Sequence, residues 1–237
     1  MTESNAAPVV PIAWVIPGII PTGLTLLAGR PKVGTSWLIL DAALALASGQ
    51  PALGQRDAPA PGRVFYLGFD NSERQLHARA ELLRGALPDL PFALATNWPA
   101  LDAGGLDRLA SYLDQFADTK LVVIDPLVGV LSPGSSEAND RAVAGLQRLA
   151  NDRHIAIVCV ITATRTIDGG SDALHVWLAT SIGLRAAADA TLVLTRVRGE
   201  DQGELALARR DAPTRNLAMH IDPAQSRWTI TGDAHPF

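Results

Sequence analysis

The sequence has little of what several protein classes depend on. It contains one cysteine, which excludes an internal disulfide, and its five histidines lack the spacing and the cysteine partners of a zinc site. No apolar run approaches the roughly 20 residues that a membrane-spanning helix requires. No block of like charges marks a broad nucleic-acid or membrane surface, and the net charge is −4. We therefore expect a cytoplasmic protein that makes no membrane contact.

What is present is an ordinary globular composition. The chain has 237 residues, of which 48% are hydrophobic and 19% are charged, enough for one large or two small domains. Residues 1–21 are punctuated by prolines and predict an extended N-terminal arm. Residues 22–237 show no shift in composition that would mark a boundary, and they predict a single domain.

Apolar runs alternate with helical patterns through the first two thirds of the chain. Strand-like runs occupy 24–28, 63–68, 92–95, 120–125 and 155–161, and helical patterns occupy 37–47, 72–87, 105–116 and 137–152. This alternation predicts an α/β fold with a mostly parallel central sheet flanked by helices. After a polar loop at 164–172 and an alanine-rich helix at 182–188, short strands are expected near 190–196, 204–208, 216–221 and 227–230. We expect these strands to extend one edge of the sheet in antiparallel fashion.

The most informative segment is Gly29–Ser36, which reads GRPKVGTS between a strand-like run and a helical pattern. It fits the phosphate-binding pattern G-x-x-x-x-G-K-[ST] except at Thr35, where the pattern has lysine. In such a loop, backbone N–H groups and a helix N-terminus converge on the phosphates, and the final hydroxyl holds Mg²⁺. The alternative is a turn that is merely rich in glycine and proline. The candidate nucleotide-binding residues are Gly29, Arg30, Pro31, Lys32, Val33, Gly34, Thr35, Ser36 and Trp37.

The expected cofactors are ATP and Mg²⁺, bound weakly or not at all, and three further side chains are candidates for chemistry. Asp125 ends a strand one sheet position from the loop, where it can hold the metal together with Ser36, or it caps the following turn. Asp70 follows the preceding strand and can orient or deprotonate the attacking water, or it is a turn residue. Arg210, beside Arg209 in a late strand, can reach the γ-phosphate of a neighbouring subunit as an arginine finger, or it is a solvated surface residue.

Several segments resemble the RepA-like (AAA_25) branch of the RecA-type P-loop ATPases, which is related to the hexameric plasmid replication helicases. They are WVIPGIIPTGLTLLAGRPKVG, FYLGFDNSERQLHAR, LVVIDPLVGVL, SIGLRAAADATLVLTR and ARRDAPTRNLAMHID. The resemblance implies a RecA-like P-loop NTPase fold over nearly the whole chain. It also implies a homo-oligomer, such as a hexameric ring, or a hetero-assembly with an active partner, and it places single-stranded DNA among the candidate ligands.

The chain departs from this family pattern at three functional places. Thr35 replaces the loop lysine, and Asp70 stands where relatives carry a glutamate. Residues 162–166 read TATRT where relatives carry a His-His-Thr-Arg-Lys sensor. The loss of one preorganised electrostatic group typically costs about 10² to 10³ in rate. These departures favour a pseudo-ATPase with an eroded site, acting as an assembling or regulatory subunit in the replication or DNA metabolism of a mobile element.

The alternative function is an active ATP-dependent helicase or translocase that works on single-stranded DNA as a hexameric ring. In that case Lys32 or a residue of a partner supplies the missing cation, and Arg165 with the Gly169–Gly170 loop contacts the phosphate backbone. Relatives carry a lysine at position 32 in addition to the one that is lost, so we interpret Lys32 as an ordinary family residue. A single engineered change at Thr35 would not explain the other departures.

Overall fold

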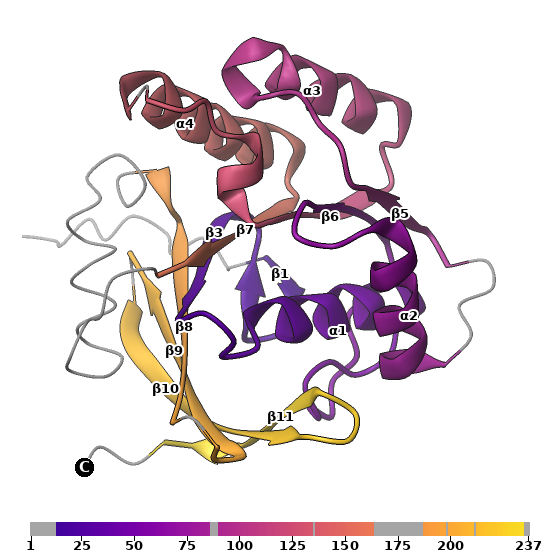
Figure 1. Cartoon of the computed structure of the whole chain (residues 1–237), viewed down its shortest axis with the longest axis vertical. Coiled ribbons are helices and arrows are strands. Elements are labelled where there is room, and N and C mark those ends of the chain that lie inside the picture. The colour runs from indigo at the N-terminus through magenta and orange to yellow at the C-terminus, as the bar shows by residue number, and fades with distance from the viewer. Residues whose placement is uncertain are drawn as a thin grey trace, which may run out of the picture.

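A nine-stranded sheet organises the residues that the computed structural model describes, which are 13–85, 90–134, 136–163, 187–197, 199–210 and 212–234 (Figure 1). Its strand order is β11-β10-β9-β8-β3-β7-β6-β4-β5. The strands are β3 (Gly23–Gly29), β4 (Arg63–Gly68), β5 (Phe92–Ala95), β6 (Thr119–Asp125), β7 (Ala156–Thr162), β8 (Ala190–Arg196), β9 (Gln202–Arg209), β10 (Ala212–Asp222) and β11 (Arg227–Asp233). The helices are α1 (Thr35–Ser48), α2 (Glu73–Arg84), α3 (Gly105–Gln115) and α4 (Ser136–Arg153), with short 3-10 turns η1 (Leu101–Ala103) and η2 (Leu127–Val130).

The strand directions confirm the expected fold class. Strands β8, β3, β7, β6, β4 and β5 pair in parallel, and β9, β10 and β11 continue from β8 in antiparallel pairs. The parallel strands are near-continuous apolar runs because helices cover both faces of that part of the sheet. The antiparallel strands alternate buried with exposed or half-buried residues, as strands with one covered face do.

One detail of the sheet order differs from expectation. We expected the strand that ends at Asp125 to lie one position from the loop-bearing strand, but β7 lies between β6 and β3. The expected position is therefore wrong by one strand. The reason is the crossover through α4, which returns the chain to the gap beside β3 before the sheet continues to β8.

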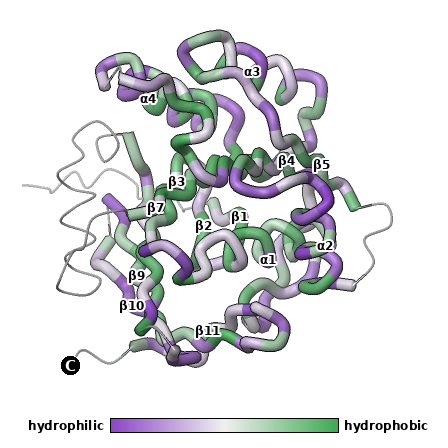
Figure 2. Tube along the Cα trace, in the orientation of Figure 1, coloured by the Kyte–Doolittle hydropathy of each residue, from purple (hydrophilic) through white to green (hydrophobic). Residues whose placement is uncertain are grey.

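Two buried clusters lie on the two faces of the sheet. One gathers residues of α1, α2 and β11, and the other gathers residues of α3 and α4. Figure 1 shows these two helix pairs on opposite sides of the strands, with β11 curving beneath α1. Every residue of α1 from Leu38 to Ala47 is buried. In Figure 2, hydrophobic residues gather along α1 and the central strands, whereas α3 and α4 alternate between hydrophobic and hydrophilic residues.

The described part of the expected arm, residues 13–21, forms a small hairpin. Strands β1 (Trp14–Ile16) and β2 (Ile20–Pro21) pair in antiparallel fashion, and the isoleucines of this segment are fully buried in the cluster around α1. Gly18, with φ 68°, takes the left-handed conformation that reverses the chain after Pro17. We did not expect this hairpin, and the division of the chain at residue 21 stays a prediction.

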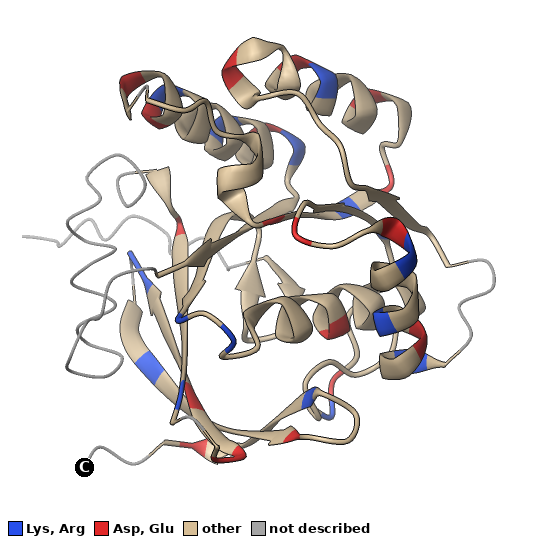
Figure 3. Cartoon of the chain, viewed as in Figure 1, with Lys and Arg blue, Asp and Glu red and all other residues tan. Residues whose placement is uncertain are grey.

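Several expectations lie outside the described residues. They are the first 12 residues of the arm, the polar loop at 164–172 with Arg165 and the Gly169–Gly170 segment, and most of the helix at 182–188. Among the described residues, no helix is both long enough and apolar enough to cross a membrane. Acidic and basic residues are interspersed over the helices and the outer strands, as Figure 3 shows.

Candidate functional site

The loop at Gly29–Gly34 connects the end of β3 to the start of α1, in the strand-loop-helix order that the sequence predicts. The loop closes on itself, since the Val33 N–H donates to the Arg30 carbonyl at 3.2 Å. The N-cap residue Gly34 has φ 109° and no side chain to bond the helix N–H groups, and the first turn of α1 has no acidic residue. The N–H groups of this first turn therefore remain suited to an external anion.

Both glycines of the loop pattern are required by close packing. A Cβ atom on Gly29 would lie 2.6 Å from Cγ1 of Val33 and 2.7 Å from Cγ2 of Thr35. A Cβ atom on Gly34 would lie 2.8 Å from Nε1 of Trp228, in a left-handed conformation that side chains rarely adopt. The loop thus takes a conformation that only these glycines permit.

Asp125 meets Ser36 despite the intervening strand. The Ser36 hydroxyl donates to Oδ1 of Asp125 at 3.2 Å, and the Tyr66 hydroxyl donates to Oδ2 at 2.6 Å. Asp125 is 5% exposed at the end of β6, and Tyr66 is fully buried on the neighbouring strand β4. Sequence reasoning joined Ser36 to Asp125 but missed Tyr66. The available signal was a tyrosine inside an apolar strand, because a buried tyrosine hydroxyl needs a partner.

Burial dominates the electrostatics of this cluster. It raises the pKa of Asp125 above its ordinary value, against the hydrogen bonds from Tyr66 and Ser36, and the negative charge of Asp70 raises it further. Burial also raises the pKa of Tyr66 well above 10, and the neighbouring Asp125 adds to that shift. Tyr66 therefore stays a hydrogen-bond donor near neutral pH.

The pair Ser36–Asp125 fits a Mg²⁺ ion in its donor chemistry. A hydroxyl and a carboxylate are hard oxygen ligands, and Mg²⁺ in nucleotide sites is held by one or two carboxylates together with phosphate oxygens and waters. Among the described residues, no group of three or more His, Cys, Asp or Glu side chains is arranged to hold a metal. A metal at this pair would accordingly take its remaining ligands from a bound phosphate and from water.

A family model and a structural likeness agree with this arrangement. The model of the AAA_25 family, an AAA domain, matches residues 2–164. The chain belongs to this family. Its structure superposes on a solved helicase ATPase domain with a TM-score of 0.70 at 13% identity, covering 88% of this chain and 84% of that one. This chain thus has the RecA-like fold of an AAA_25 P-loop protein.

A curated relative of this AAA_25 chain is the DNA repair protein RadA of Helicobacter pylori (strain J99). The two are 30% identical over 154 residues, which cover 64% of this chain and 31% of RadA. The chain therefore spans about a third of the length of that relative.

The remaining carboxylate of the AAA_25 site, Asp70, lies just beyond the end of β4 and is exposed. Its charge acts on Asp125, which places the two carboxylates on the same side of the sheet edge. Arg79 on α2 opposes that charge and lies over the ring of Trp37, 4.9 Å from its centroid. Sequence reasoning did not single out Arg79.

Arg210 lies at the opposite end of the sheet from the loop of its own chain. Leu194 of β8 pairs with Gly29 beside the loop, whereas Arg209 pairs with Ala190 at the other end of β8. Arg210 is exposed, and its Nε atom donates to the Ala188 carbonyl at 3.1 Å. A contact between this guanidinium and a loop-bound phosphate can therefore only be made with the loop of a neighbouring copy.

Two side chains from the C-terminal part of the chain hold the loop, and sequence reasoning missed both. The Trp228 indole N–H donates to the Gly34 carbonyl at 3.3 Å. A terminal N–H of Arg196 donates to the Lys32 carbonyl at 3.5 Å, and its guanidinium carbon lies 5.8 Å from the centroid of the Trp228 ring. These contacts join positions 164 and 194 residues apart, so no local pattern announces them.

A buried ion pair ties the same C-terminal part to α1. Asp41 is fully buried, and its Oδ1 atom lies 2.8 Å from Nε of Arg84 on α2 and 3.6 Å from Nε of Arg227 on β11. The other carboxylate oxygen has no hydrogen-bond partner in the described part of the chain. Asp41 thus fixes α1 against two neighbouring elements.

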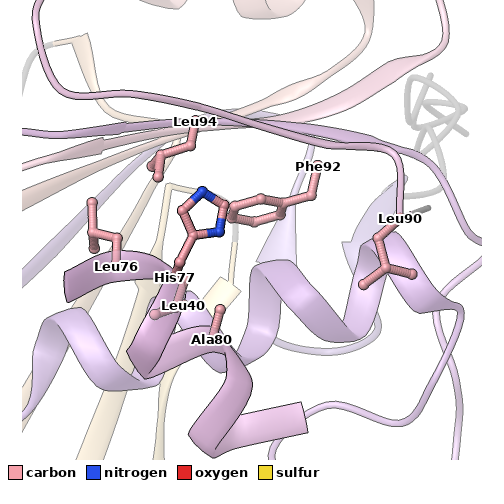
Figure 4. A pocket seen from close by; sticks show the side chains of 7 residues that line it. All are labelled: Leu40, Leu76, His77, Ala80, Leu90, Phe92 and Leu94. Atoms are coloured by element: carbon pink, nitrogen blue, oxygen red, sulfur yellow. The ribbon is translucent and has the colours of Figure 1, made fainter. Parts of the chain in front are cut away.

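A small apolar cavity of about 70 Å³ lies away from the loop (Figure 4). Its lining comes from α1, α2 and the chain at β5, and comprises Leu40, Leu76, His77, Ala80, Leu90, Phe92 and Leu94. Figure 4 shows the His77 ring directed toward Phe92. Sites for nucleotide-sized ligands measure about 300 Å³ or more, so this cavity is not the nucleotide site.

Proposed function

We propose that the chain binds a nucleoside triphosphate with Mg²⁺ weakly and hydrolyses it slowly or not at all. In this proposal it serves as an assembling or regulatory subunit in the replication or DNA metabolism of a mobile element. The observation that carries the proposal is the intact setting around Thr35. The glycine loop and the Ser36–Asp125 pair are in place, whereas the residue at the lysine position brings no charge.

The magnitudes support binding over turnover. A charge-assisted hydrogen bond contributes about 1.5 to 3 kcal/mol, which is about 10- to 150-fold in affinity, so a ligand held by many backbone N–H groups survives its loss. Asp70 has a shorter reach than the glutamate of relatives, and the loss of one electrostatic group alone costs about 10² to 10³ in rate. Hydrolysis therefore suffers more than binding.

The assembly in this proposal is an oligomer in which Arg210 of one copy faces the loop of the next. Its support is the exposed position of Arg210 at the sheet end opposite its own loop. The link to DNA is supported by the printed role of the relative RadA in DNA repair. Fold kinship alone does not transfer an activity, so both points require their own test.

The deciding experiment compares ATP binding and ATP turnover in the native chain and in three variants. Calorimetry with ATP and Mg²⁺ is expected to give weak binding for the native chain and about 10- to 150-fold tighter binding for Thr35→Lys. The matched control Thr35→Gln adds length without charge and should leave the affinity near the native value. Rapid turnover by the native chain that Asp125→Ala abolishes would overturn the proposal.

The second candidate is an active motor on single-stranded DNA. The exposed Arg210 favours it as well, because a ring of copies would complete each site with a guanidinium from a neighbour. ATP turnover that rises when single-stranded DNA is added would support this function. Absence of DNA binding at low salt, where electrostatic attraction is strongest, would count against it.

A further inference from the structure

The supply of positive charge near the loop is narrow. The chain has two lysines, Lys32 and Lys120, and Lys120 lies at the start of β6, where its ammonium group bonds the Ala60 carbonyl. Lys32 is exposed on the loop itself. Any other cation for a loop-bound phosphate has to be an arginine brought from elsewhere in the fold.

Arg196 projects on the face of the sheet that carries the loop. It follows Leu194 by two positions in β8, and side chains two positions apart in a strand point to the same face. Leu194 is buried in the cluster around α1 and pairs with Gly29, the first loop residue. Arg196 therefore stands level with the loop and on its side of the sheet.

The charge of Arg196 is not neutralised by a carboxylate. Its contacts are the Lys32 carbonyl and the face of Trp228, and no Asp or Glu of the described residues lies within ion-pair distance of it. Trp228 is itself fixed, since it is fully buried and bonds Gly34. A half-buried guanidinium is thus held against the loop with its charge unpaired.

We propose that Arg196 supplies the positive charge that Thr35 does not provide, and that the group it binds is the polyphosphate of a nucleotide. This inference rests on the proposed nucleotide binding. A guanidinium carries five N–H donors in a planar fork, so it can keep one bond to the Lys32 carbonyl and direct others at phosphate oxygens. An ammonium group in the same place could not divide its bonds in this planar way.

Arg79 is the competing cation, and its contacts assign it a different task. It lies on the α2 side of the loop, stacked on Trp37, and its charge acts on Asp125. Asp125 thus draws on the charge of Arg79, whereas the charge of Arg196 opposes no carboxylate. The phosphate site consequently takes its cation from the β8 side.

The test is a double-mutant cycle on the full chain, with ATP plus Mg²⁺ and with inorganic tripolyphosphate as probes in calorimetry. In the native background, Arg196→Ala is expected to weaken the binding of both probes by about 10-fold or more. In the Thr35→Lys background, where the loop has its own cation, the same change should cost less than about 3-fold. Arg141→Ala, an exposed arginine on α4, is the control and should change neither affinity.

Two conservative variants separate charge from support of the loop. Arg196→Gln keeps a donor for the Lys32 carbonyl but has no charge, and it should bind as weakly as Arg196→Ala. Arg196→Lys keeps the charge and should recover part of the affinity. Equal binding by Arg196→Gln and the native chain would show that the residue only supports the loop, and it would overturn the proposal.

The remaining outcomes separate this inference from the proposed function. If neither the native chain nor Thr35→Lys binds either probe, the nucleotide site itself is wrong, and Arg196 falls with it. If Thr35→Lys binds but the native chain does not, the site stands and Arg196 supplies no useful charge. If Arg79→Ala loses affinity and Arg196→Ala does not, the cation comes from α2.

Discussion

The parallel strands and the C-terminal part of the chain, residues 190–233, contribute different things to the same loop. The parallel strands β3, β4 and β6 bring the loop, Tyr66 and Asp125 together at one edge, where the polar atoms are buried and bonded to one another. The C-terminal part reaches the loop with Arg196 and Trp228, which bond backbone carbonyls. Topology alone places the first group, whereas the second depends on individual long side chains.

This difference teaches where such a site can change. Carboxyl ends of parallel strands meet at one edge whatever their sequence, so the metal side persists with the fold. A charge that comes from a side chain can be moved to another element. The loss at Thr35 and the arrival of Arg196 fit that division.

The largest effect is expected for Trp228→Ala, which removes a fully buried indole from between the C-terminal part and the loop. Truncation of a buried tryptophan costs about 3 to 5 kcal/mol in the free energy of unfolding, measured by guanidinium titration. Trp228→Phe keeps most of the packing and should cost much less. A cost below about 1 kcal/mol for Trp228→Ala would mean that the C-terminal part does not hold the loop.

A smaller effect is expected for Asp41→Ala, which unpairs Arg84 and Arg227. Removal of one partner of a buried ion pair costs about 3 to 5 kcal/mol, and we expect the lower end because Arg227 is 33% exposed. The matched control is Asp233→Ala, which breaks an exposed pair with Arg215 and should cost less than about 1 kcal/mol. Similar costs for the two variants would contradict the assigned role of Asp41.

The smallest effect tests the parallel side through Tyr66→Phe, which removes the 2.6 Å hydrogen bond to Asp125. Loss of a bond to a charged group costs about 1.5 to 3 kcal/mol near neutral pH. This bond opposes the rise in the pKa of Asp125, so the variant raises that pKa further.

The pH dependence of that variant follows from the sign of the shift. A carboxyl with a raised pKa stabilises the fold at low pH and loses that contribution as the pH rises. The deficit of Tyr66→Phe should therefore grow from about pH 4 to about pH 7, measured by urea titration at several pH values. Tyr112→Phe removes a tyrosine hydroxyl on α3 instead and should show no such trend.

Much of the fold could be predicted because its signals are local. The runs at 63–68 and 120–125 are apolar and short, and the structure contains strands β4 and β6 there. The pairing of Ser36 with Asp125 followed from the loop pattern and from a carboxylate at a strand end. These inferences need only the spacing of residues and the rule that parallel strands end at a common edge.

The rest depends on contacts between distant segments. Trp228 and Arg196 reach the loop from strands at the far end of the sequence, and their residue types would serve equally well on a surface. The position of β7 between β3 and β6 is a matter of crossover order, which apolar runs do not encode. The hairpin at 13–21 was hidden by its prolines, which are equally common in extended segments.

Helix α1, enclosed along its length from Leu38 to Ala47, has a consequence for how an anion enters. A helix that is gripped on every side cannot slide or tilt to meet a ligand, so its first turn acts as a fixed mould. The exposed crest of Arg30, Pro31 and Lys32 is the part left free to yield. Recognition at this loop should accordingly discriminate anions by shape, with the entropy of ordering already spent when the chain folds.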